Sequence, residues 1–553
     1  MPLLKICPYK DSSIEEIKNW LYGINWPAVY IIYNTKKAYV GETLDLVRRT
    51  EQHLKEDEFK EFTDICLISD KTFNKSVILD LESYLIKYMS ADKTHILING
   101  NAGVVNHNYF YKDAYEDDFK EIWDKLLKLG IVSSSIADIE NSELFKYSPY
   151  KSLNEEQQNA AYDILQKLSK IKNGSYKSLI KVVGGAGTGK TILAVFLVKL
   201  LTDINHNKRI WNALDDAEIS EYIRVLSTQI TQFKRVGFVV PMNELRETMK
   251  DIFSSIDGLS SDMVLAPESV VEATTPYDLL IVDEAHRLYQ RQHLPGIQMY
   301  AKFDRINERL MGDHFSKSKS DYTELDWIIK SSRVQLLFYD ELQSIRATDI
   351  DKDRFESICK PHLFAYYSLF SQMRCKGGNG YYEYVKKVLD SSDLGIRDYQ
   401  KIDNYQAIVV DDITDLFDII NEKNKQIGLC NIVCGPGWTK SEDIVIDGNS
   451  YHWSESKKKR DENSIISIHK SQGFDLNYAG VIFGKEVYYD SESGRIEVNK
   501  NELQDNFTKS DGDDAMRHYI INIYLTLMTR GILGTYVYAC DPALREYLKM
   551  FLN

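Results

Sequence analysis

A glycine-rich string in the middle of the chain constrains the fold more than any other feature. Residues 184–191 read Gly-Gly-Ala-Gly-Thr-Gly-Lys-Thr and fit the pattern G-x-x-x-x-G-K-[ST] without a mismatch. The apolar run 178–183 before the string predicts a short buried strand, and the run 192–200 after it predicts a helix. The string therefore has the strand, loop and helix order that this phosphate-binding pattern requires. A glycine-rich turn that only joins the strand to the helix is the structural alternative.

The residue types in this string suit a nucleoside triphosphate. Glycines let backbone N–H groups close around phosphate at a helix N-terminus, and a lysine adds a positive charge for the β- and γ-phosphates. The hydroxyl of Thr191 is a suitable ligand for Mg²⁺, so we expect ATP with Mg²⁺ as the bound species. The residues expected to contact the nucleotide are Gly184, Gly185, Ala186, Gly187, Thr188, Gly189, Lys190 and Thr191.

Composition is typical of a multidomain protein from a reducing compartment. With 553 residues, 43% of them hydrophobic, several domains with sizeable cores are expected. No stretch approaches the roughly 18 consecutive apolar residues of a membrane-spanning helix, and the N-terminus lacks a signal-peptide pattern. The seven cysteines are scattered and odd in number, which favours free thiols over a disulfide framework. We therefore expect a cytoplasmic protein that does not contact a membrane.

The charge balance limits the partners. A formal net charge of −14 argues against a protein that coats nucleic acid without selectivity, because phosphate contacts need Lys and Arg. A locally basic groove is compatible with this charge, and residues 314–319 and 457–460 are candidate contacts. Short charged runs of this kind are also common in solvated loops.

The first hundred residues contain a hairpin pattern with two tyrosines. Residues 29–33 and 38–41 are runs typical of strands, and the four residues between them predict a turn. A turn centred on this stretch pairs Tyr30 with Gly41. Tyr30 and Tyr39 then lie on the same face of the sheet, because side chains two apart along a strand point the same way.

Two predicted helices add charged side chains to this unit. The helix expected over residues 44–55 carries Arg49 and His53, which are four residues apart and so lie on one side. The helix expected over residues 77–89 carries Glu82 within an apolar set. Two tyrosines, an arginine, a histidine and a carboxylate are thus available to one surface.

In order and spacing these residues resemble the GIY-YIG nuclease family. The resemblance implies that Tyr30 and Tyr39 activate the attacking water and that His53 assists proton transfer. It further implies that Arg49 steadies the pentavalent phosphate and that Glu82 holds a single divalent metal, Mg²⁺ or Mn²⁺. Cleavage of a phosphodiester needs such a set: a nucleophile, a cation for the developing charge, and a metal as Lewis acid.

One position departs from the family signature. Ala28 stands where the family has its first glycine, and because that glycine is a backbone position we expect altered packing around an intact site. The resemblance also implies an asparagine that closes the site, at Asn99 or Asn101. A domain that has lost cleavage and only binds nucleic acid or protein is the alternative, as are tyrosines that simply pack the sheet.

An acidic pair marks a second, larger unit that begins near Leu153. The apolar strand 277–282 runs into Asp283 and Glu284. Ligands bind at the C-terminal edge of parallel sheets, so Asp283 is expected to reach Mg²⁺ and Glu284 to orient the attacking water. A helix N-cap is the structural alternative for this pair. Gln157 precedes the glycine-rich string, where its amide could bond the edge of adenine.

Further polar motifs follow in a fixed order. Past the apolar strand 335–339, Gln343 is placed to sense the γ-phosphate. The later motifs are Gln372-Met373-Arg374, His469-Lys470-Ser471-Gln472-Gly473 and Tyr524 to Gly531. Together they resemble the ordered motifs of superfamily 1 helicases, and more closely the Schlafen-type helicase-like ATPases of bacteria, over roughly residues 150–545.

This second resemblance implies a motor with two lobes. Arg374 and Arg530 would be arginine fingers from the second lobe, and Gln472 with Gly473 would couple the nucleotide state to the bound strand. Charge stabilisation from across a cleft links hydrolysis to lobe closure, so the arrangement is physically reasonable.

We therefore expect an α/β protein in which a small α+β GIY-YIG domain precedes two RecA-like lobes with doubly wound parallel sheets. The expected ranges are 1–105 for the nuclease domain, 106–150 for a helical connector, 151–350 for the first lobe and 351–553 for the second. The expected function is a nucleic-acid-dependent ATPase, translocase or helicase coupled to a metal-dependent endonuclease in bacterial genome defence or repair. DNA is favoured over RNA, and an oligomer or a partner defence protein is envisaged. The alternative is an ATP-driven switch whose N-terminal domain recognises nucleic acid without cutting it.

Overall fold

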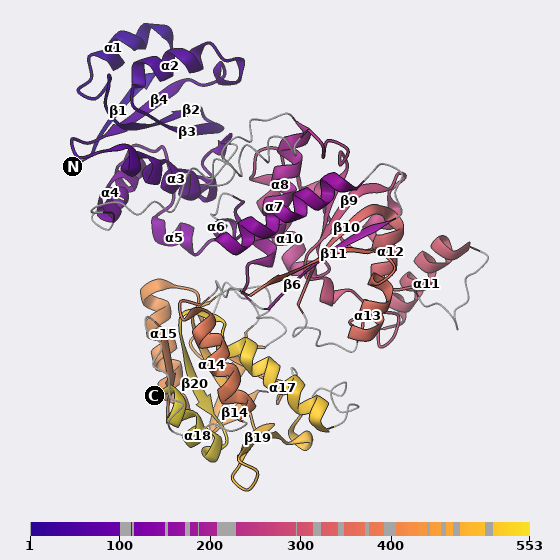
Figure 1. The fold of residues 1–553 in the computed structure, drawn as a ribbon. Coiled ribbons are helices and arrows are strands. Elements are labelled where there is room, and N and C mark those ends of the chain that lie inside the picture. Colours follow the sequence, from indigo (N-terminus) through magenta and orange to yellow (C-terminus); the bar gives the residue numbers. More distant parts are fainter. Residues whose placement is uncertain are drawn as a thin grey trace.

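The computed structural model describes residues 2–99, 112, 115–149, 153–171, 177–185, 187–206, 228–294, 296–312, 322–340, 348–370, 375–391, 405–438, 443–454, 461–467, 476–503 and 513–553. Over these residues the chain is an α/β protein in which a small α+β unit precedes two lobes built on parallel sheets (Figure 1). The expected fold class is confirmed.

The N-terminal unit is a five-stranded sheet with helices on both faces. Its strands have the order β1-β4-β2-β3-β5, and each pair is antiparallel except β3 with β5. The elements are β1 (Leu3–Pro8), α1 (Ile14–Lys18), β2 (Ala28–Tyr33), β3 (Lys37–Thr43), α2 (Leu46–Leu54), β4 (Asp64–Ser69), α3 (Lys75–Asp92) and β5 (Ile96–Leu97). The hairpin register places Tyr30 opposite Gly41, as the sequence predicted.

A helical connector follows. It comprises α4 (Tyr115–Lys128), α5 (Ile136–Glu140) and α6 (Glu143–Tyr147). The buried side of α4 carries Phe119, Ile122, Trp123 and Leu126, whose spacing of three or four residues places them on one helical face. These residues belong to one continuous apolar core that runs from β2 and α3 through the connector into the first lobe. The N-terminal unit is therefore packed onto the first lobe rather than tethered by an open linker.

The first lobe has a six-stranded sheet in which every strand pair is parallel, with the order β11-β6-β10-β9-β7-β8. Its strands are β6 (Ser178–Gly184), β7 (Val236–Val239), β8 (Val264–Leu265), β9 (Tyr277–Val282), β10 (Ser332–Tyr339) and β11 (Leu363–Leu369). Its helices are α7 (Glu155–Lys170), α8 (Lys190–Asn205), α10 (Asn243–Ser254), α11 (Ile297–Met311), α12 (Glu324–Ser331) and α13 (Lys352–Cys359). Separate apolar cores on the two faces of the sheet make this lobe doubly wound.

The division between the lobes differs from the predicted break after residue 350. Strand β11 pairs with β6 of the first sheet from Leu363 to Leu369, so the chain stays in the first lobe past the expected boundary. The sequence run from residue 363 to 369 alone did not reveal which sheet it would join, because strand pairing is a tertiary contact.

The second lobe has a seven-stranded sheet with the order β12-β20-β17-β13-β16-β15-β14, in which only β14 with β15 is antiparallel among the described pairs. Its strands are β12 (Gln406–Val409), β13 (Cys430–Cys434), β14 (Ile444–Ile446), β15 (Asn449–Trp453), β16 (Ser464–Ser467), β17 (Leu476–Phe483) and β20 (Gly531–Ala539), with the hairpin β18 (Val487–Asp490) and β19 (Arg495–Val498) beside them. Its helices are α14 (Gly378–Asp390), α15 (Ile413–Ile427), α17 (Asp513–Met528) and α18 (Pro542–Leu552).

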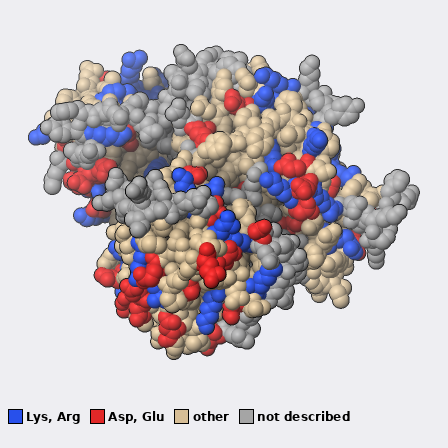
Figure 2. Space-filling model, turned by 60° about the horizontal axis from the view of Figure 1, so that its bottom comes forward, with Lys and Arg blue, Asp and Glu red and all other residues tan. Residues whose placement is uncertain are grey.

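Surface charge is mixed on the face that Figure 2 shows. Lys and Arg side chains lie among Asp and Glu side chains over both lobes on this face, rather than in one basic stripe. Among the described residues, no helix is both long and apolar enough to cross a membrane.

Candidate functional sites

The first candidate site lies on the hairpin face of the N-terminal sheet. Tyr30 of β2 and Tyr39 of β3 lie on the same face, with ring centroids 6.3 Å apart. His53 of α2 packs against both rings, at 5.8 Å from Tyr30 and 5.4 Å from Tyr39. Tyr30 and His53 are each 2% exposed, whereas Tyr39 is half-buried. The structure thus brings the three predicted residues into one cluster.

One hydroxyl group connects three of the predicted residues. Tyr30 Oη lies 2.9 Å from His53 Nε2, and Arg49 donates from Nε to the same oxygen at 3.1 Å. Burial raises the pKa of Tyr30 well above its usual value, and the neighbouring Tyr39 raises it further, although Arg49 opposes the rise. The hydroxyl therefore keeps its proton at neutral pH and lies within hydrogen-bond distance of the imidazole.

The glycine of the second signature segment is required by close contact. A Cβ atom added at Gly41 would lie 2.3 Å from Tyr30 Oη, much closer than two such atoms can approach. The position of the first signature glycine is less restrictive, because Ala28 is buried at the start of β2 and pairs with Thr43. The alanine at position 28 therefore affects how the strand packs and replaces none of the reactive groups of the site.

Glu82 approaches this cluster from α3. Burial raises its pKa to about 8, the carboxylate of Glu42 raises it further, and Lys75 and Arg49 oppose the rise. Lys75 also pairs with Glu42, with 2.5 Å between Nζ and Oε2. Glu82 in turn raises the pKa of both Tyr30 and Tyr39, so it lies within electrostatic range of the two hydroxyl groups.

The residues around Glu82 fit a divalent cation. The carboxylate of Glu42 lies close enough to Glu82 to make ionisation of Glu82 less favourable. A divalent cation between them would offset this repulsion. Among the described residues no group of three or more metal-ligating side chains forms. A site with one or two carboxylates and several waters suits Mg²⁺, which gives up its waters reluctantly.

Asn99 supports the hairpin from the side. Its Nδ2 donates to the carbonyl of Val40 at 2.7 Å, and its Oδ1 accepts from the N–H of Val40 at 3.0 Å. Asn99 is buried and clamps β3 between Tyr39 and Gly41. Its alternative in the sequence, Asn101, lies outside the described residues.

The second candidate site is the glycine-rich loop between β6 and α8. Gly187 and Gly189 have φ angles of +82° and +77°, which side chains rarely adopt. A Cβ atom added at Gly184 would lie 2.6 Å from Thr188 Oγ1. A Cβ atom added at Gly185 would have room, and Ala186 lies outside the described residues. The loop therefore depends on glycine at Gly184, Gly187 and Gly189 for its shape.

Lys190 is held inside the loop. Its Nζ donates to the carbonyls of Gly184 at 2.7 Å and Gly185 at 2.8 Å, and lies 3.1 Å from Asp340 Oδ2. Both charged side chains of this ion pair are buried. The ammonium group thus occupies the loop at the position where a phosphate would need a counter-charge.

Thr191 and the acidic pair meet at the same edge. Thr191 Oγ1 donates to Asp283 Oδ2 at 2.8 Å, which joins the two predicted Mg²⁺ ligands. Burial raises the pKa of Asp283, and the adjacent carboxylate of Glu284 raises it further. A hydroxyl and a carboxylate at this distance are the pair of oxygen donors that a nucleotide-bound Mg²⁺ takes in proteins of this kind.

Glu284 has a constrained backbone and a histidine partner, His286, that was not among the predicted site residues. Its φ is +50°, an uncommon conformation for a residue with a side chain. Its Oε2 lies 3.0 Å from His286 Nε2, while His286 Nδ1 accepts from the N–H of Asp340 at 3.3 Å. Burial raises the pKa of Glu284, but His286 together with Lys190 and Arg287 lowers it below its usual value. His286 directly follows the acidic pair in the string Asp-Glu-Ala-His, which was the available signal.

Gln157 has a different place from the adenine contact that we expected. It is 1% exposed, and its Nε2 donates to the carbonyls of Thr188 at 3.2 Å and Gly189 at 3.3 Å. Its Oε1 accepts from the N–H of Asn154 at 3.1 Å, in the capping box that begins α7. Both ends of the amide are engaged within the protein, so in this structure Gln157 braces the nucleotide loop from behind.

The second lobe presents one predicted arginine and one unpredicted tyrosine. Arg530 is 1% exposed in the short segment between α17 and β20. Tyr382 of α14 reaches the first lobe, because a Cβ atom added at Gly185 would lie 3.9 Å from its Oη. Burial raises the pKa of Tyr382 to about 12, and the carboxylate of Asp340 adds to the rise. The predicted residues Gln343, Arg374, Gln472 and Gly473 lie outside the described residues, as do both basic stretches, 314–319 and 457–460.

The fold and the two sites define a class: a two-lobed P-loop protein of the helicase type that carries a GIY-YIG domain at its N-terminal end. The model of the GIY-YIG catalytic domain matches residues 27–94. The model of the Schlafen group 3 DNA/RNA helicase domain matches residues 177–541, about two thirds of the chain. The chain belongs to the Schlafen group 3 helicase-domain family.

Individual proteins are more distant. The uncharacterized protein YPL245W of Saccharomyces cerevisiae is 26% identical over 439 residues, which cover 69% of this chain and 86% of the yeast protein. The structure of the Pif1 helicase from Candida albicans is 13% identical, covers 73% of this chain and 97% of that one, and has a TM-score of 0.26. The structure of C. elegans PCH-2 is 10% identical and covers 72% and 81%, with a TM-score of 0.18.

Proposed function

We propose that this protein is a nucleic-acid-dependent ATPase that translocates along or unwinds its substrate, coupled to a divalent-metal-dependent endonuclease. The observation that carries the proposal is that one chain assembles both sets of groups. Tyr30, Arg49 and His53 share one hydroxyl, and Lys190, Thr191 and Asp283 meet at one sheet edge. A continuous apolar core joins the N-terminal unit to the first lobe, which carries the second site.

In the nuclease reaction, the hydrogen-bonded groups divide the work. His53 would accept the proton that the attacking water loses, with Tyr30 and Tyr39 orienting that water. Arg49 would stabilise the charge that develops on the phosphate, since its guanidinium already points at the Tyr30 hydroxyl. The metal, held by Glu82 with Glu42 beside it, would act as the Lewis acid.

In ATP hydrolysis, the ion pair between Lys190 and Asp340 is the interaction that must break. A bound phosphate would draw the ammonium of Lys190 away from the Asp340 carboxylate, because it offers a larger negative charge. Glu284, held by His286, would orient the attacking water. Arg530 and Arg374 would approach from the second lobe as it closes, which links hydrolysis to lobe movement.

The setting of this activity is also a proposal. We place the protein in the cytoplasm, supported by seven cysteines, none of which forms a disulfide among the described residues. We favour DNA as the substrate, an oligomer or a partner defence protein as its context, and genome defence or repair as its role. The description of the family as a DNA/RNA helicase domain supports nucleic acid as the partner without choosing between the two.

Plasmid cleavage with Mg²⁺ tests the nuclease. Wild type should nick the plasmid, while Arg49→Ala and Glu82→Gln should each lose most of that activity. Equal nicking by all three proteins would remove the nuclease and leave the alternative, an ATP-driven switch whose N-terminal domain binds nucleic acid without cutting it.

ATP hydrolysis measured with single-stranded, duplex and branched DNA and RNA tests the motor. We expect phosphate release that one class of nucleic acid stimulates, with cleavage followed in the same tubes. If no nucleic acid stimulates phosphate release, the second unit is a nucleotide-binding scaffold and not a motor.

A further inference from the structure

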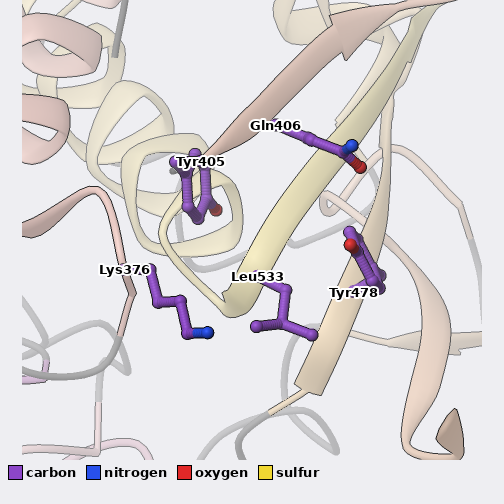
Figure 3. Close-up of a pocket in the computed structure, with 5 residues that line it drawn as sticks. All are labelled: Lys376, Tyr405, Gln406, Tyr478 and Leu533. Carbon is purple, nitrogen blue, oxygen red and sulfur yellow. The ribbon is translucent and has the colours of Figure 1, made fainter. Parts of the chain in front are cut away.

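A cavity of about 660 Å³ opens at the edge of the second-lobe sheet, where β12, β17 and β20 begin. It is lined by Lys376, Tyr405, Gln406, Tyr478 and Leu533. Figure 3 shows Tyr405 and Lys376 on one side and Gln406 and Tyr478 on the other, with Leu533 between them.

The walls of this cavity are fixed before any ligand binds. The N–H of Lys376 donates to the carbonyl of Ile532 at 2.8 Å, which ties the segment before α14 to the segment that opens β20. Tyr405 Oη lies 2.8 Å from Thr535 Oγ1 and donates to the carbonyl of Gly531 at 3.0 Å. Tyr405 is therefore a rigid aromatic wall, and binding against it would cost little conformational entropy.

The polar groups of the cavity suit one edge of a heterocyclic base. Gln406 Oε1 accepts from Tyr536 Oη at 2.9 Å, which orients the amide and leaves its two N–H donors directed elsewhere. Tyr478 is half-buried, and the ammonium of Lys423 lies 4.7 Å from its ring centroid. An aromatic face with a cation behind it and an amide beside it is a surface on which a base can stack and form hydrogen bonds.

The cationic groups suit a phosphate. Lys376 is exposed at the rim of the cavity, and the ammonium of Lys423 lies over the ring of Tyr478. In a protein with a net charge of −14, two ammonium groups beside an aromatic cavity offer local attraction to an anion. The aromatic and amide groups of the cavity thus match the base of a nucleotide, and the ammonium groups match its phosphate.

We propose that this cavity is a nucleotide-unit pocket, in which a base stacks on Tyr478, Gln406 contacts the base edge and Lys376 contacts the phosphate. The proposal rests on the proposed nucleotide-dependent function and extends it to a site outside the glycine-rich loop. The unit is part of a single strand or a free nucleotide, two sources with the same chemistry. The pocket borders the start of β20, directly after Arg530, because Tyr405 donates to the carbonyl of Gly531.

Two pocket variants and one matched control test this site in the full chain. The pocket variants are Tyr478→Ala, which removes the stacking face, and Lys376→Glu, which reverses an exposed charge without disturbing the core. The control is Tyr488→Ala, because Tyr488 is 39% exposed on β18 and does not line the pocket. Fluorescence anisotropy would measure affinity for labelled oligothymidylate and oligouridylate, and fluorescence titration would measure affinity for mant-ATP. Thermal melting would confirm that each variant folds.

We expect both pocket variants to bind one class of probe about tenfold more weakly or worse, and the control to match wild type. A loss for the oligonucleotides alone assigns the pocket to a strand, and a loss for mant-ATP alone assigns it to a free nucleotide. Unchanged affinity for all probes in both folded variants, with a wild type that binds them, overturns the pocket and leaves the proposed function standing. A wild type that binds no probe overturns both.

Discussion

Asn477 at the start of β17 donates from Nδ2 to Oδ1 of Asn141 at 3.0 Å, which joins the second lobe to the connector. Asn141 in turn donates to the carbonyl of Ile427 at 2.9 Å. The preceding residue, Glu140, accepts a hydrogen bond of 2.6 Å from Tyr88 on α3, the helix that carries Glu82. A short chain of contacts thus runs from the second lobe to the nuclease site.

Breaking this chain should weaken the effect of ATP on cleavage. Asn141→Ala removes two neutral hydrogen bonds, worth about 1 kcal/mol each, and should reduce the ratio of cleavage with and without ATP by a few fold. ATP hydrolysis itself should change little. The control is Asn424→Ala, because Asn424 bonds to Cys430 within the second lobe. A ratio that is the same in Asn141→Ala and wild type would exclude this route.

Gly41→Ala should abolish most of the cleavage without unfolding the domain. The added Cβ would lie 2.3 Å from Tyr30 Oη and push that hydroxyl away from His53 and Arg49. A misplacement of this size can cost about 10²-fold in rate. Ala28→Gly is the matched control, since it restores the family glycine at a position without such a contact, and we expect it to cut like wild type. Gly41→Ala that nicks plasmid normally would show that the Tyr30 hydroxyl does not take part.

Tyr382→Phe should impair ATP hydrolysis through the loss of one hydroxyl group. Its Oη faces Gly185 of the nucleotide loop, so we expect it to bond the triphosphate when the lobes close. A hydrogen bond to a charged group is worth about 1.5–3 kcal/mol, so the KM for ATP should rise about tenfold. Steady-state kinetics measure this, with melting temperature as the check on folding.

Tyr381→Phe is the control for that variant. Tyr381 is the adjacent residue on α14, but it is fully buried and donates to the carbonyl of Met528 at 3.1 Å. We expect it to lower the melting temperature and leave the KM for ATP unchanged. The opposite pattern, with the kinetic defect in Tyr381→Phe, would argue that Tyr382 does not contact the nucleotide.

Lys190→Ala should eliminate ATP hydrolysis and also destabilise the first lobe. The variant removes the phosphate-binding cation and leaves the buried Asp340 carboxylate without its ion-pair partner. Leaving a buried charge uncompensated costs about 3–5 kcal/mol. In the double variant Lys190→Ala with Asp340→Asn most of this stability should return while hydrolysis stays absent. Denaturant unfolding and phosphate release separate the two effects.

Glu324 should make the stability of the first lobe depend on pH. Burial raises its pKa to about 8 in the folded state from 4.5, although the N–H of Tyr289 opposes the rise. Between these values the folded state holds a proton that the unfolded state has released, so stability falls as pH rises from about 4.5 to about 8. The slope is at most about 1.4 kcal/mol per pH unit. Below 4.5 both states are protonated and this group adds no dependence.

Glu324→Gln tests this effect. The amide keeps an acceptor for the N–H of Tyr289 and carries no titrating proton, so the fall in stability over this range should be smaller than in wild type. Glu272→Gln, at an exposed position, serves as the control and should follow wild type. Unfolding curves that decline equally in wild type and Glu324→Gln would show that Glu324 is ionised in the folded protein.

The local sequence by itself determined the elements that carry the chemistry. The pattern around Lys190 fixed a strand, a loop and a helix, since glycines with positive φ and a long apolar run leave few other conformations. The short turn between the strands of Tyr30 and Tyr39 set the hairpin register, because the length of a hairpin loop decides which residues pair across it.

Contacts between distant residues were decided only by the tertiary structure. The amide of Gln157 turns to the carbonyls of the loop rather than outward, and Tyr382 reaches Gly185 from the other lobe. Strand β11 joins the first sheet, and the pocket around Tyr405 and Tyr478 forms where three strands begin. The physical reason is the same in each case: local propensity and periodicity specify how a segment is shaped, whereas its partners depend on packing across the whole chain.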